Sequence, residues 1–315
     1  MQNPNEGDAQ TGVAWPPRRI VAIVNPATHR PAEPIVEQLK AAVPDGVNLD
    51  VRLTERAGVT GETALAALPG ADLIVAVGGD GTTADVAGAI GAYRDSSGVD
   101  VPLAVIPAGS TNITSRELRI PRKIAEAIDL LYGRRASRFR GMDLCQANDR
   151  LFLHMAGSGL DSRLFAETNH DLKRRVGWLA YVPPTLKNLR IPPAIYRIET
   201  DGTTQTVESP LVLIANGGGL MSPRVQLYPG IRSDDGVLDV LIFTPASGVA
   251  ILRTLGRTAT RSLDRSPYVV RLRAKEVTLD ADSPQPVQVD GDVALQTPVR
   301  FAIRDSGLRV VVPAP

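Results

Sequence analysis

Apolar and polar residues alternate in blocks along the first 135 residues, and the blocks predict strands and helices in turn. Apolar runs of strand length lie at 19–24, 49–53, 72–77 and 101–106. Helical periodicity covers 31–43, 60–68, 83–93 and 122–131. Strands that alternate with helices predict an α/β domain with a parallel, doubly wound, Rossmann-like sheet. Ligands of such sheets bind outside the carboxyl ends of the strands.

The pattern changes after about residue 136, where short β runs follow one another. These runs lie at 151–155, 194–200, 211–215, 237–243, 268–279 and 299–303. The turn dipeptides Asp201-Gly202 and Ser306-Gly307 separate several of them. We therefore expect a mostly antiparallel second domain, a sandwich or an open barrel, with inserted helices at 162–181 and 246–261.

Three parts follow from these patterns. Residues 1–18 are polar and Pro-rich, which predicts a disordered leader and not a signal peptide. Residues 19–135 form the expected α/β domain, to which 307–315 return, and 136–306 form the β-rich domain.

Composition narrows the class of protein. A hydrophobic content of 43% in 315 residues is enough for two ordinary cores. The net charge of +1 provides no polybasic field, which argues against a nucleic-acid partner. The single cysteine, Cys145, excludes an intrachain disulfide and a Cys-based zinc site. No apolar run approaches the roughly 18 residues of a spanning helix, so we expect a cytoplasmic protein whose membrane contact is peripheral.

The most informative chemistry lies where the run Leu73–Val77 breaks into Gly78, Gly79, Asp80, Gly81 and Thr82. A strand, a Gly-rich turn and a helix start bring backbone N–H groups and the positive end of a helix dipole together, which favours phosphate. A carboxylate repels bare phosphate, so Asp80 indicates a metal ion between it and the phosphates. The polar loops 25–30, 78–82 and 107–112 should all converge on this edge of the sheet.

Other phosphate loops fit less well. The chain has no G-x-x-x-x-G-K-[ST], which excludes a P-loop NTPase. Residues 79–84 fit the loose G-x-G-x-x-G/A pattern of dinucleotide-binding proteins. The acid required about twenty residues later would be Asp100, which begins the next apolar run instead of ending one. A dinucleotide dehydrogenase and a purely structural strand–turn–helix remain the alternatives from the loop alone.

Several further motifs occur in a fixed order from Ile20 to Pro313. Ile106–Asn112 with Arg116 is similar to P-x-G-T-x-N-D-x-x-R, and Asn216-Gly217 with Pro229 and Asp235–Val240 is similar to N-G…P…D-G-x-L-D. Asp290-Gly291-Asp292 lies at the position of a D-G-E motif. With GGDGT at Gly78–Thr82, this series resembles the diacylglycerol kinase catalytic superfamily, which includes bacterial lipid kinases and sphingosine kinases. NAD kinases share GGDGT but not the later series.

The resemblance implies an ATP- and Mg²⁺-dependent kinase that phosphorylates a hydroxyl of diacylglycerol or a related lipid substrate. The nucleotide-binding residues that it implies are Asn25, Thr28, Arg30, Gly78, Gly79, Asp80, Gly81, Thr82, Gly109, Ser110 and Asn112. It implies metal ligands at Asp80, Asp143 and Asp235. The alternatives are an NAD kinase-like enzyme and a nucleotide- or lipid-binding member with little kinase activity.

The resemblance also implies catalytic roles for Asp290 and Asp292. We expect an extended segment, in which residues two apart face the same side. One carboxylate would then take the proton of the lipid hydroxyl and the other would support the metal. An Asp-Gly hairpin turn is the alternative.

The chain departs from the family motifs at four places. The expected N-P-x-S-G reads Asn25 to His29, N-E after GGDGT reads Ala84-Asp85, N-D reads Asn112-Ile113, and D-G-E ends in Asp292. These departures leave open an altered substrate or reduced turnover.

The predicted helix 162–181 carries Lys173, Arg174 and Arg175 among aromatic residues. This composition suits a peripheral membrane interface. The interpretation that we favour is a helix that packs on the sheet and has a solvated basic face. A homodimer is left open.

Overall fold

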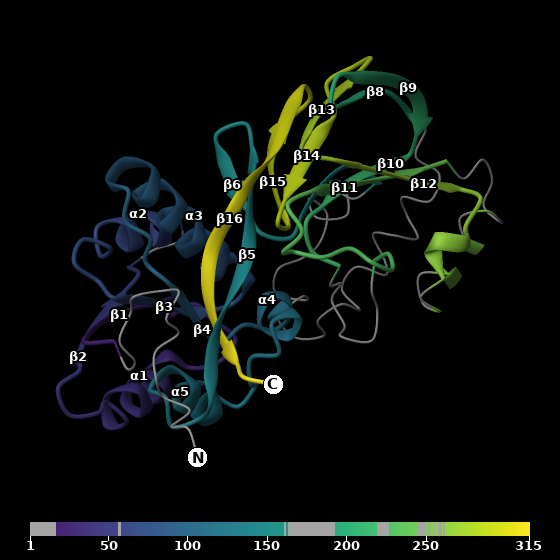
Figure 1. Ribbon diagram of the computed structural model, residues 1–315. Helices are drawn as coiled ribbons and strands as arrows, with labels where there is room; N and C mark the ends of the chain where they lie inside the picture. The colour runs from purple at the N-terminus through teal and green to yellow at the C-terminus, as the bar shows by residue number, and fades with distance from the viewer. Residues whose placement is uncertain are drawn as a thin grey trace. The chain divides into compact units, whose positions relative to one another are not determined.

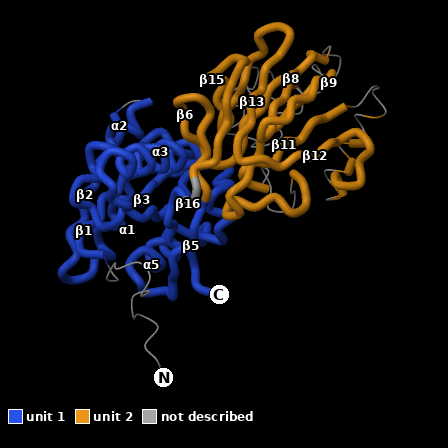
Figure 2. The backbone as a smooth tube through the Cα atoms, turned by 45° about the horizontal axis from the view of Figure 1, so that its top comes forward, with its two compact units in different colours: residues 1–142, 306–315 blue, residues 143–305 orange. Residues whose placement is uncertain are grey.

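The computed structural model describes residues 17–55, 58–160, 162, 193–218, 227–244, 250, 253–254, 256–257, 260 and 262–315. Contacts divide the chain into two compact units, coloured separately in Figure 2. One unit is Met1–Met142 with Ser306–Pro315, and the other is Asp143–Asp305. Strands β5 (Ser137–Ala147) and β16 (Val299–Pro313) run from one unit into the other.

The first unit contains a parallel sheet in the order β2-β1-β3-β4-β16. The strands are β1 (Arg19–Val24), β2 (Asn48–Leu53), β3 (Leu73–Gly78) and β4 (Leu103–Pro107), and Val310 of β16 pairs with Leu103. Every residue of β3 and β4 is buried, whereas the edge strand β2 is partly exposed. Central strands of a sheet that is covered on both faces read as continuous apolar runs, as the sequence does here.

Helices cover both faces of this sheet. They are α1 (Ala32–Ala41), α2 (Thr60–Leu65), α3 (Asp80–Ser97), α4 (Ile113–Glu117) and α5 (Ile124–Leu131). Figure 1 shows α2 and α3 on one face and α1 and α5 on the other, and each pair is in contact. The predicted doubly wound α/β domain is therefore confirmed.

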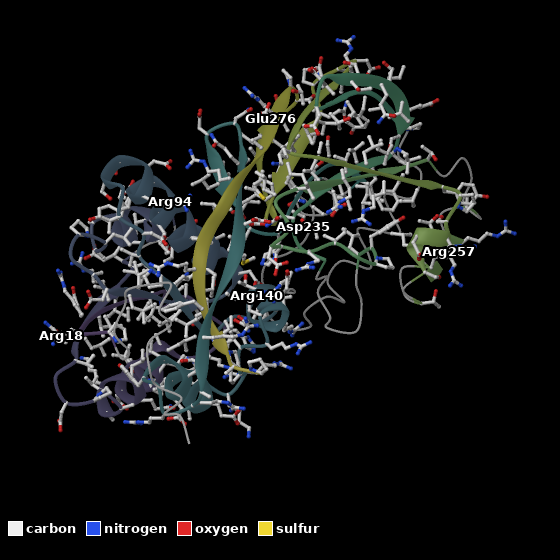
Figure 3. The ribbon with its side chains drawn as sticks, in the orientation of Figure 1. Arg18, Arg94, Arg140, Asp235, Arg257 and Glu276 are labelled. Atoms are coloured by element: carbon white, nitrogen blue, oxygen red, sulfur yellow. The ribbon has the colours of Figure 1, made fainter. Side chains whose placement is uncertain are left out.

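The chain's last strand is secured to the first unit by arginines. Arg309 donates from Nε to Asp100 Oδ2 at 2.5 Å and lies over the ring of Phe139. Arg94 of α3, labelled in Figure 3, donates to the Gly307 carbonyl at 2.9 Å. These contacts hold the end of β16 beside β4.

The second unit packs two antiparallel sheets around one core. One sheet has the order β12-β11-β10-β7-β14-β15 and the other continues from β16 through β13, β8 and β9. The strands are β6 (Arg150–Phe152), β7 (Met155–Gly159), β8 (Ala194–Thr200), β9 (Thr203–Ser209), β10 (Leu211–Ala215), β11 (Leu238–Phe243), β12 (Val269–Ala274), β13 (Glu276–Ala281), β14 (Pro286–Val289) and β15 (Asp292–Gln296). Both sheets contribute buried residues to a shared core that contains Phe152, Tyr196 and Phe301. This is the predicted β-sandwich.

Two of the predicted strand boundaries were wrong. The run 268–279 is two strands, because the chain leaves one sheet at the end of β12 and enters the other at the start of β13. Ser306-Gly307 is no turn, because β16 continues through it. Asp201-Gly202 does form the predicted hairpin turn between β8 and β9, with positive φ at both residues.

Some expectations fall on residues outside the described ranges. All but the first residue of the basic aromatic helix predicted at 162–181 lies outside them, and so does most of the helix predicted at 246–261. Within the described part of the chain, no helix has the length and apolarity needed to cross a membrane.

Candidate active site

The GGDGT segment joins β3 to α3, and only Gly79 lies between the end of the strand and the start of the helix. β3 ends at Gly78, Gly79 is extended, and Asp80 is already the first residue of α3. The prediction that the helix begins at Thr83 was therefore one turn late. The N–H groups of a first helical turn have no partners within their own helix, so this segment presents donors directly at the carboxyl edge of the sheet.

A second loop touches this one backbone against backbone. A Cβ atom at Gly109 would lie 2.5 Å from the Cα of Gly79 and 2.9 Å from Oδ1 of Asn112. The Gly109 N–H donates to the carbonyl of Gly78 at 3.1 Å. Only glycine at position 109 allows the two loops this approach.

Asn112 closes the second loop on itself. Its Oδ1 accepts from the Gly109 N–H at 3.0 Å, and its Nδ2 donates to the Gly109 carbonyl at 2.7 Å. Asn112 has φ of 51°, a left-handed conformation that asparagine tolerates better than most residues. This turn leads directly into α4, where Asp80 Oδ1 accepts from the N–H of Thr114 at 3.1 Å.

The loop that begins at Asn25 is the third loop at this edge of the sheet. Asn25 donates from Nδ2 to Thr82 Oγ1 at 3.2 Å, and the Arg30 N–H donates to the Ala108 carbonyl at 3.1 Å. The Thr28 hydroxyl donates within its own turn to the Arg30 carbonyl at 2.6 Å. Three loops that are far apart in sequence thus interlock at one edge of the sheet.

Asp80 is suited to a metal ion that phosphates also bind. The Oδ1 of Asp80 accepts hydrogen bonds from Thr114, and no hydrogen bond within the described residues uses the Oδ2 of Asp80. No group of three or more His, Cys, Asp or Glu side chains in the described ranges could hold a metal by itself. Mg²⁺ commonly takes one or two carboxylates and completes its shell with substrate phosphates and water, so this single carboxylate fits such an ion.

Asp143 and Asp235 lie in the second unit, where they are neighbours. Asp143 is buried, and its Oδ2 accepts from the Gly236 N–H at 2.9 Å. Burial raises the pKa of Asp143, and the nearby Asp235 and Asp234 raise it further. Asp235, labelled in Figure 3, pairs through Oδ2 with Arg273, while its buried Oδ1 has no hydrogen-bond partner among the described residues. Metal binding at these two aspartates stays a prediction.

The raised pKa of Asp143 gives a testable pH dependence. The folded state holds the proton of Asp143 more tightly than the unfolded chain does. The stability that protonated Asp143 contributes is therefore lost as pH rises through the folded-state pKa. Asp143→Asn should therefore raise the free energy of unfolding more at pH 7 than at pH 3. Thermal melts at both pH values measure this, with the exposed Asp282→Asn as control. An equal change at both pH values would contradict it.

Asp290 lies in a turn and Asp292 is the first residue of β15, so the prediction that both lie in one extended segment was wrong. Asp290 and Gly291 both have positive φ and form the hairpin turn between β14 and β15. Asp-Gly favours this turn. The Asp290 carboxylate accepts from the N–H groups of Leu153, His154 and Met155 at 2.8–3.1 Å. Asp292 is mostly exposed and pairs with Arg150 at 2.8 Å.

Known proteins match both halves of the chain. A family model of the diacylglycerol kinase catalytic domain matches residues 19–147. A second model, the YegS C-terminal NAD kinase beta sandwich-like domain, matches residues 154–312. A Pseudomonas aeruginosa protein named "Probable lipid kinase YegS-like" is 34% identical over 289 residues, which cover 88% of this chain and 90% of that protein. The chain belongs to the diacylglycerol kinase catalytic-domain superfamily.

Another relative and a solved structure are also similar to this chain. A "Probable lipid kinase YegS-like" protein of Pseudomonas putida is 33% identical over 285 residues, covering 88% of this chain and 91% of its own. A crystal structure of a "putative diacylglycerol kinase" from Bacillus anthracis superposes with a TM-score of 0.78 at 24% identity, covering 95% and 96% of the two chains. The chain spans 55% of a longer Synechocystis protein, sll0036, at 28% identity. The resemblance expected from the motifs is confirmed, and the chain is a member of a lipid kinase family.

In this lipid kinase, the structure also shows contacts of residues to which the sequence analysis assigned no role. Asp239 is fully buried and pairs with Arg271 at 2.6 Å, and Arg273 links it to Asp235. The sequence signal for these ion pairs was the presence of two arginines at alternate positions of β12 and of an acidic segment before β11. Thr114, which contacts Asp80, had no signal, because its role depends on the turn made by Asn112.

Proposed function

We propose that this lipid kinase uses ATP with Mg²⁺ and transfers the γ-phosphoryl group to a hydroxyl of diacylglycerol or a related lipid. The observation that supports it best is the close backbone approach of Gly79 and Gly109 beside Asp80. Closely packed glycine loops at a helix start favour a phosphate chain. A carboxylate at the same place favours a phosphate-bound cation.

Each part of this site has a task in phosphoryl transfer, which depends on positioning and charge stabilisation. The N–H groups of the first turn of α3 bind phosphate oxygens and fix the direction of the chain of phosphates. Asp80 would hold Mg²⁺ through its Oδ2, and the ion would supply positive charge that neutralises the phosphates. Asn25 and Asn112 keep the loops in place through their contacts with Thr82 and Gly109.

Asp290 is the proposed base for the acceptor hydroxyl. Its Oδ1 accepts two backbone N–H groups and its Oδ2 accepts one, which leaves a lone pair on Oδ2. As the acceptor oxygen bonds to the γ-phosphorus, the bond to the β-phosphate oxygen breaks and ADP leaves. The proton of the acceptor hydroxyl passes to Oδ2.

A panel of acceptors tests the substrate class. Labelled ATP is supplied with diacylglycerol, a sphingoid base, phosphatidylglycerol or NAD, and the products are separated. We expect label in a lipid, with diacylglycerol the best acceptor. Label in NAD alone would assign the chain to the NAD kinase alternative, and ATP binding without any labelled product would leave only a binding role.

Asp80→Asn tests the metal role separately. Asparagine keeps an oxygen for the Thr114 N–H but removes the negative charge, so α4 should begin as before. We expect the Mg²⁺ concentration for half-maximal turnover to rise about tenfold, a change of ~1.4 kcal/mol. A Mg²⁺ titration identical to that of the parent would contradict this role for Asp80.

A further inference from the structure

Leu153 and His154 form a bend between β6 and β7, in the second unit. β6 ends at Phe152 and β7 begins at Met155, so the bend lies outside both strands. Both of its residues are buried, and buried backbone groups outside a strand need partners elsewhere. The N–H groups of the bend, with that of Met155, donate to the Asp290 carboxylate at 2.8–3.1 Å. The bend thus supplies the donors that hold the proposed base.

The carbonyl groups of the same bend accept from the residues that follow β10. Nδ2 of Asn216 donates to the Leu153 carbonyl at 2.8 Å. The backbone N–H of Asn216 donates to the His154 carbonyl at 2.8 Å, and the next N–H along the chain donates to the same carbonyl at 3.1 Å. A trans peptide group directs its N–H and its C=O to opposite sides. The peptide groups of the bend are therefore held by Asp290 on one side and by Asn216 on the other.

The side chain of Asn216 is itself fixed by a third segment. It is fully buried, and its Nδ2 also donates to the carbonyl of Asp143 in β5 at 3.1 Å. Both N–H donors of the amide are thus in use, and both of their partners are carbonyl oxygens, which can only accept. A hydroxyl side chain offers one donor and a carboxylate offers none. Asparagine therefore joins β5 to the bend with one small, uncharged group.

Hydrogen bonds in series strengthen one another in a buried site. When the Leu153 carbonyl accepts from Asn216, the N–H of the same peptide group, that of His154, becomes a better donor to Asp290. The same reasoning applies to the next peptide group, whose N–H is that of Met155. Loss of the amide would leave the first peptide group free to rotate away from the carboxylate.

We propose that Asn216 is a positioning residue for phosphoryl transfer, because it fixes the bend that orients the Asp290 carboxylate. Asn216 acts through the bend and not through the substrate. This inference rests on the proposed function, in which Asp290 takes the proton of the acceptor hydroxyl. It adds a residue to the catalytic machinery that lies behind the base.

Amide hydrogen exchange of the full chain, read by NMR, tests the positioning without any substrate. Asn216→Ala removes both side-chain donors, and Ser209→Ala is the matched control. Ser209 is also fully buried, and its hydroxyl serves the carbonyls of Leu211 and Phe243 instead of the bend. Rates are taken relative to those of β11, so that a general loss of stability cancels.

The amides that donate to Asp290 should respond to one variant only. In Asn216→Ala, the N–H groups of His154 and Met155 should exchange at least about tenfold faster, as loss of a buried hydrogen bond predicts. In Ser209→Ala their exchange should change less than about twofold, because its lost hydrogen bonds lie elsewhere in the unit.

Turnover gives a second readout that a merely structural role would not move. Asn216→Ala should lower kcat at least about tenfold, because a misplaced base slows the transfer step. The ATP affinity and the KM for the lipid acceptor should change less than about twofold, because the base acts in the transition state and not in binding. In a chain that already carries Asp290→Asn, Asn216→Ala should lower kcat no further.

The outcomes separate this inference from the proposed function. Parental exchange at His154 and Met155 in Asn216→Ala, or faster exchange with parental kcat, would overturn the inference even if the enzyme labels lipid. Faster exchange in a chain that labels no acceptor would support the link from Asn216 to Asp290 and overturn the proposed function instead. If Asn216→Ala does not fold, Asn216→Ser, which keeps one donor, decides by the same two readouts.

Discussion

Gly109→Ala should lower turnover by about 100-fold, because the two phosphate loops can no longer touch. The added Cβ would lie 2.5 Å from the Cα of Gly79, a backbone atom, well inside the ordinary contact distance. The loops would have to separate by about 1 Å, and a misplacement of that size costs about 100-fold in the rate of a reaction that depends on positioning. The measurement is the turnover of the folded variant.

Gly81→Ala is the matched control for this prediction. Position 81 belongs to the same GGDGT motif, but no atom lies within 4 Å of an added Cβ there. It is the second residue of α3, where alanine favours the helix by up to about 1 kcal/mol. We expect its melting temperature to equal or exceed that of the parent. Equal losses of turnover in the two variants would contradict the close-contact argument.

Asp290→Asn should have two effects at once. Loss of the proposed base should reduce turnover by about 10²–10⁴-fold. The amide nitrogen would also face one of the three N–H groups that the carboxylate now accepts, which should destabilise the second unit by about 1–3 kcal/mol. Turnover is measured well below the melting temperature so that the two effects stay separate.

Asp292→Asn is the control variant, and it shows how much of the loss of stability in Asp290→Asn is specific to Asp290. Its carboxylate is mostly exposed and pairs with the exposed Arg150, so its loss should cost at most about 1 kcal/mol. ATP affinity should be unchanged in Asp290→Asn, because its proposed partner is the acceptor. A variant at Asp290 that melts and turns over like the parent would remove both roles from this residue.

The sequence was most informative where one physical requirement dominates. β1, β3 and β4 are buried on both faces, so their apolar runs located them closely. The Asp201-Gly202 turn was also predicted, because few dipeptides accept positive φ at both positions. The switch between sheets at Lys275 was missed, although the sequence carries a signal for it: Lys275-Glu276 interrupts the alternation, and the apolar positions change from Leu272 and Ala274 to Val277 and Leu279.

The candidate site was predicted in outline and not in its contacts. Parallel topology requires the loops after β1, β3 and β4 to share an edge, so Asn25, Asp80 and Gly109 could be grouped from the sequence. The bond between Asp80 and Thr114 depends on a left-handed residue at Asn112 and could not be read from spacing. The sequence signal for the turn at Asp290-Gly291 is the same Asp-Gly dipeptide that predicts the turn at Asp201-Gly202.

One reaction tests the central claim most directly. The full chain is incubated with γ-labelled ATP, Mg²⁺ and vesicles that contain diacylglycerol, and both ADP and organic-phase label are measured over time. The account predicts one labelled lipid phosphate for each ADP formed, with both lost together in Asp80→Asn at low Mg²⁺. ADP formed without labelled lipid, or no ADP from a protein that binds ATP, would contradict it.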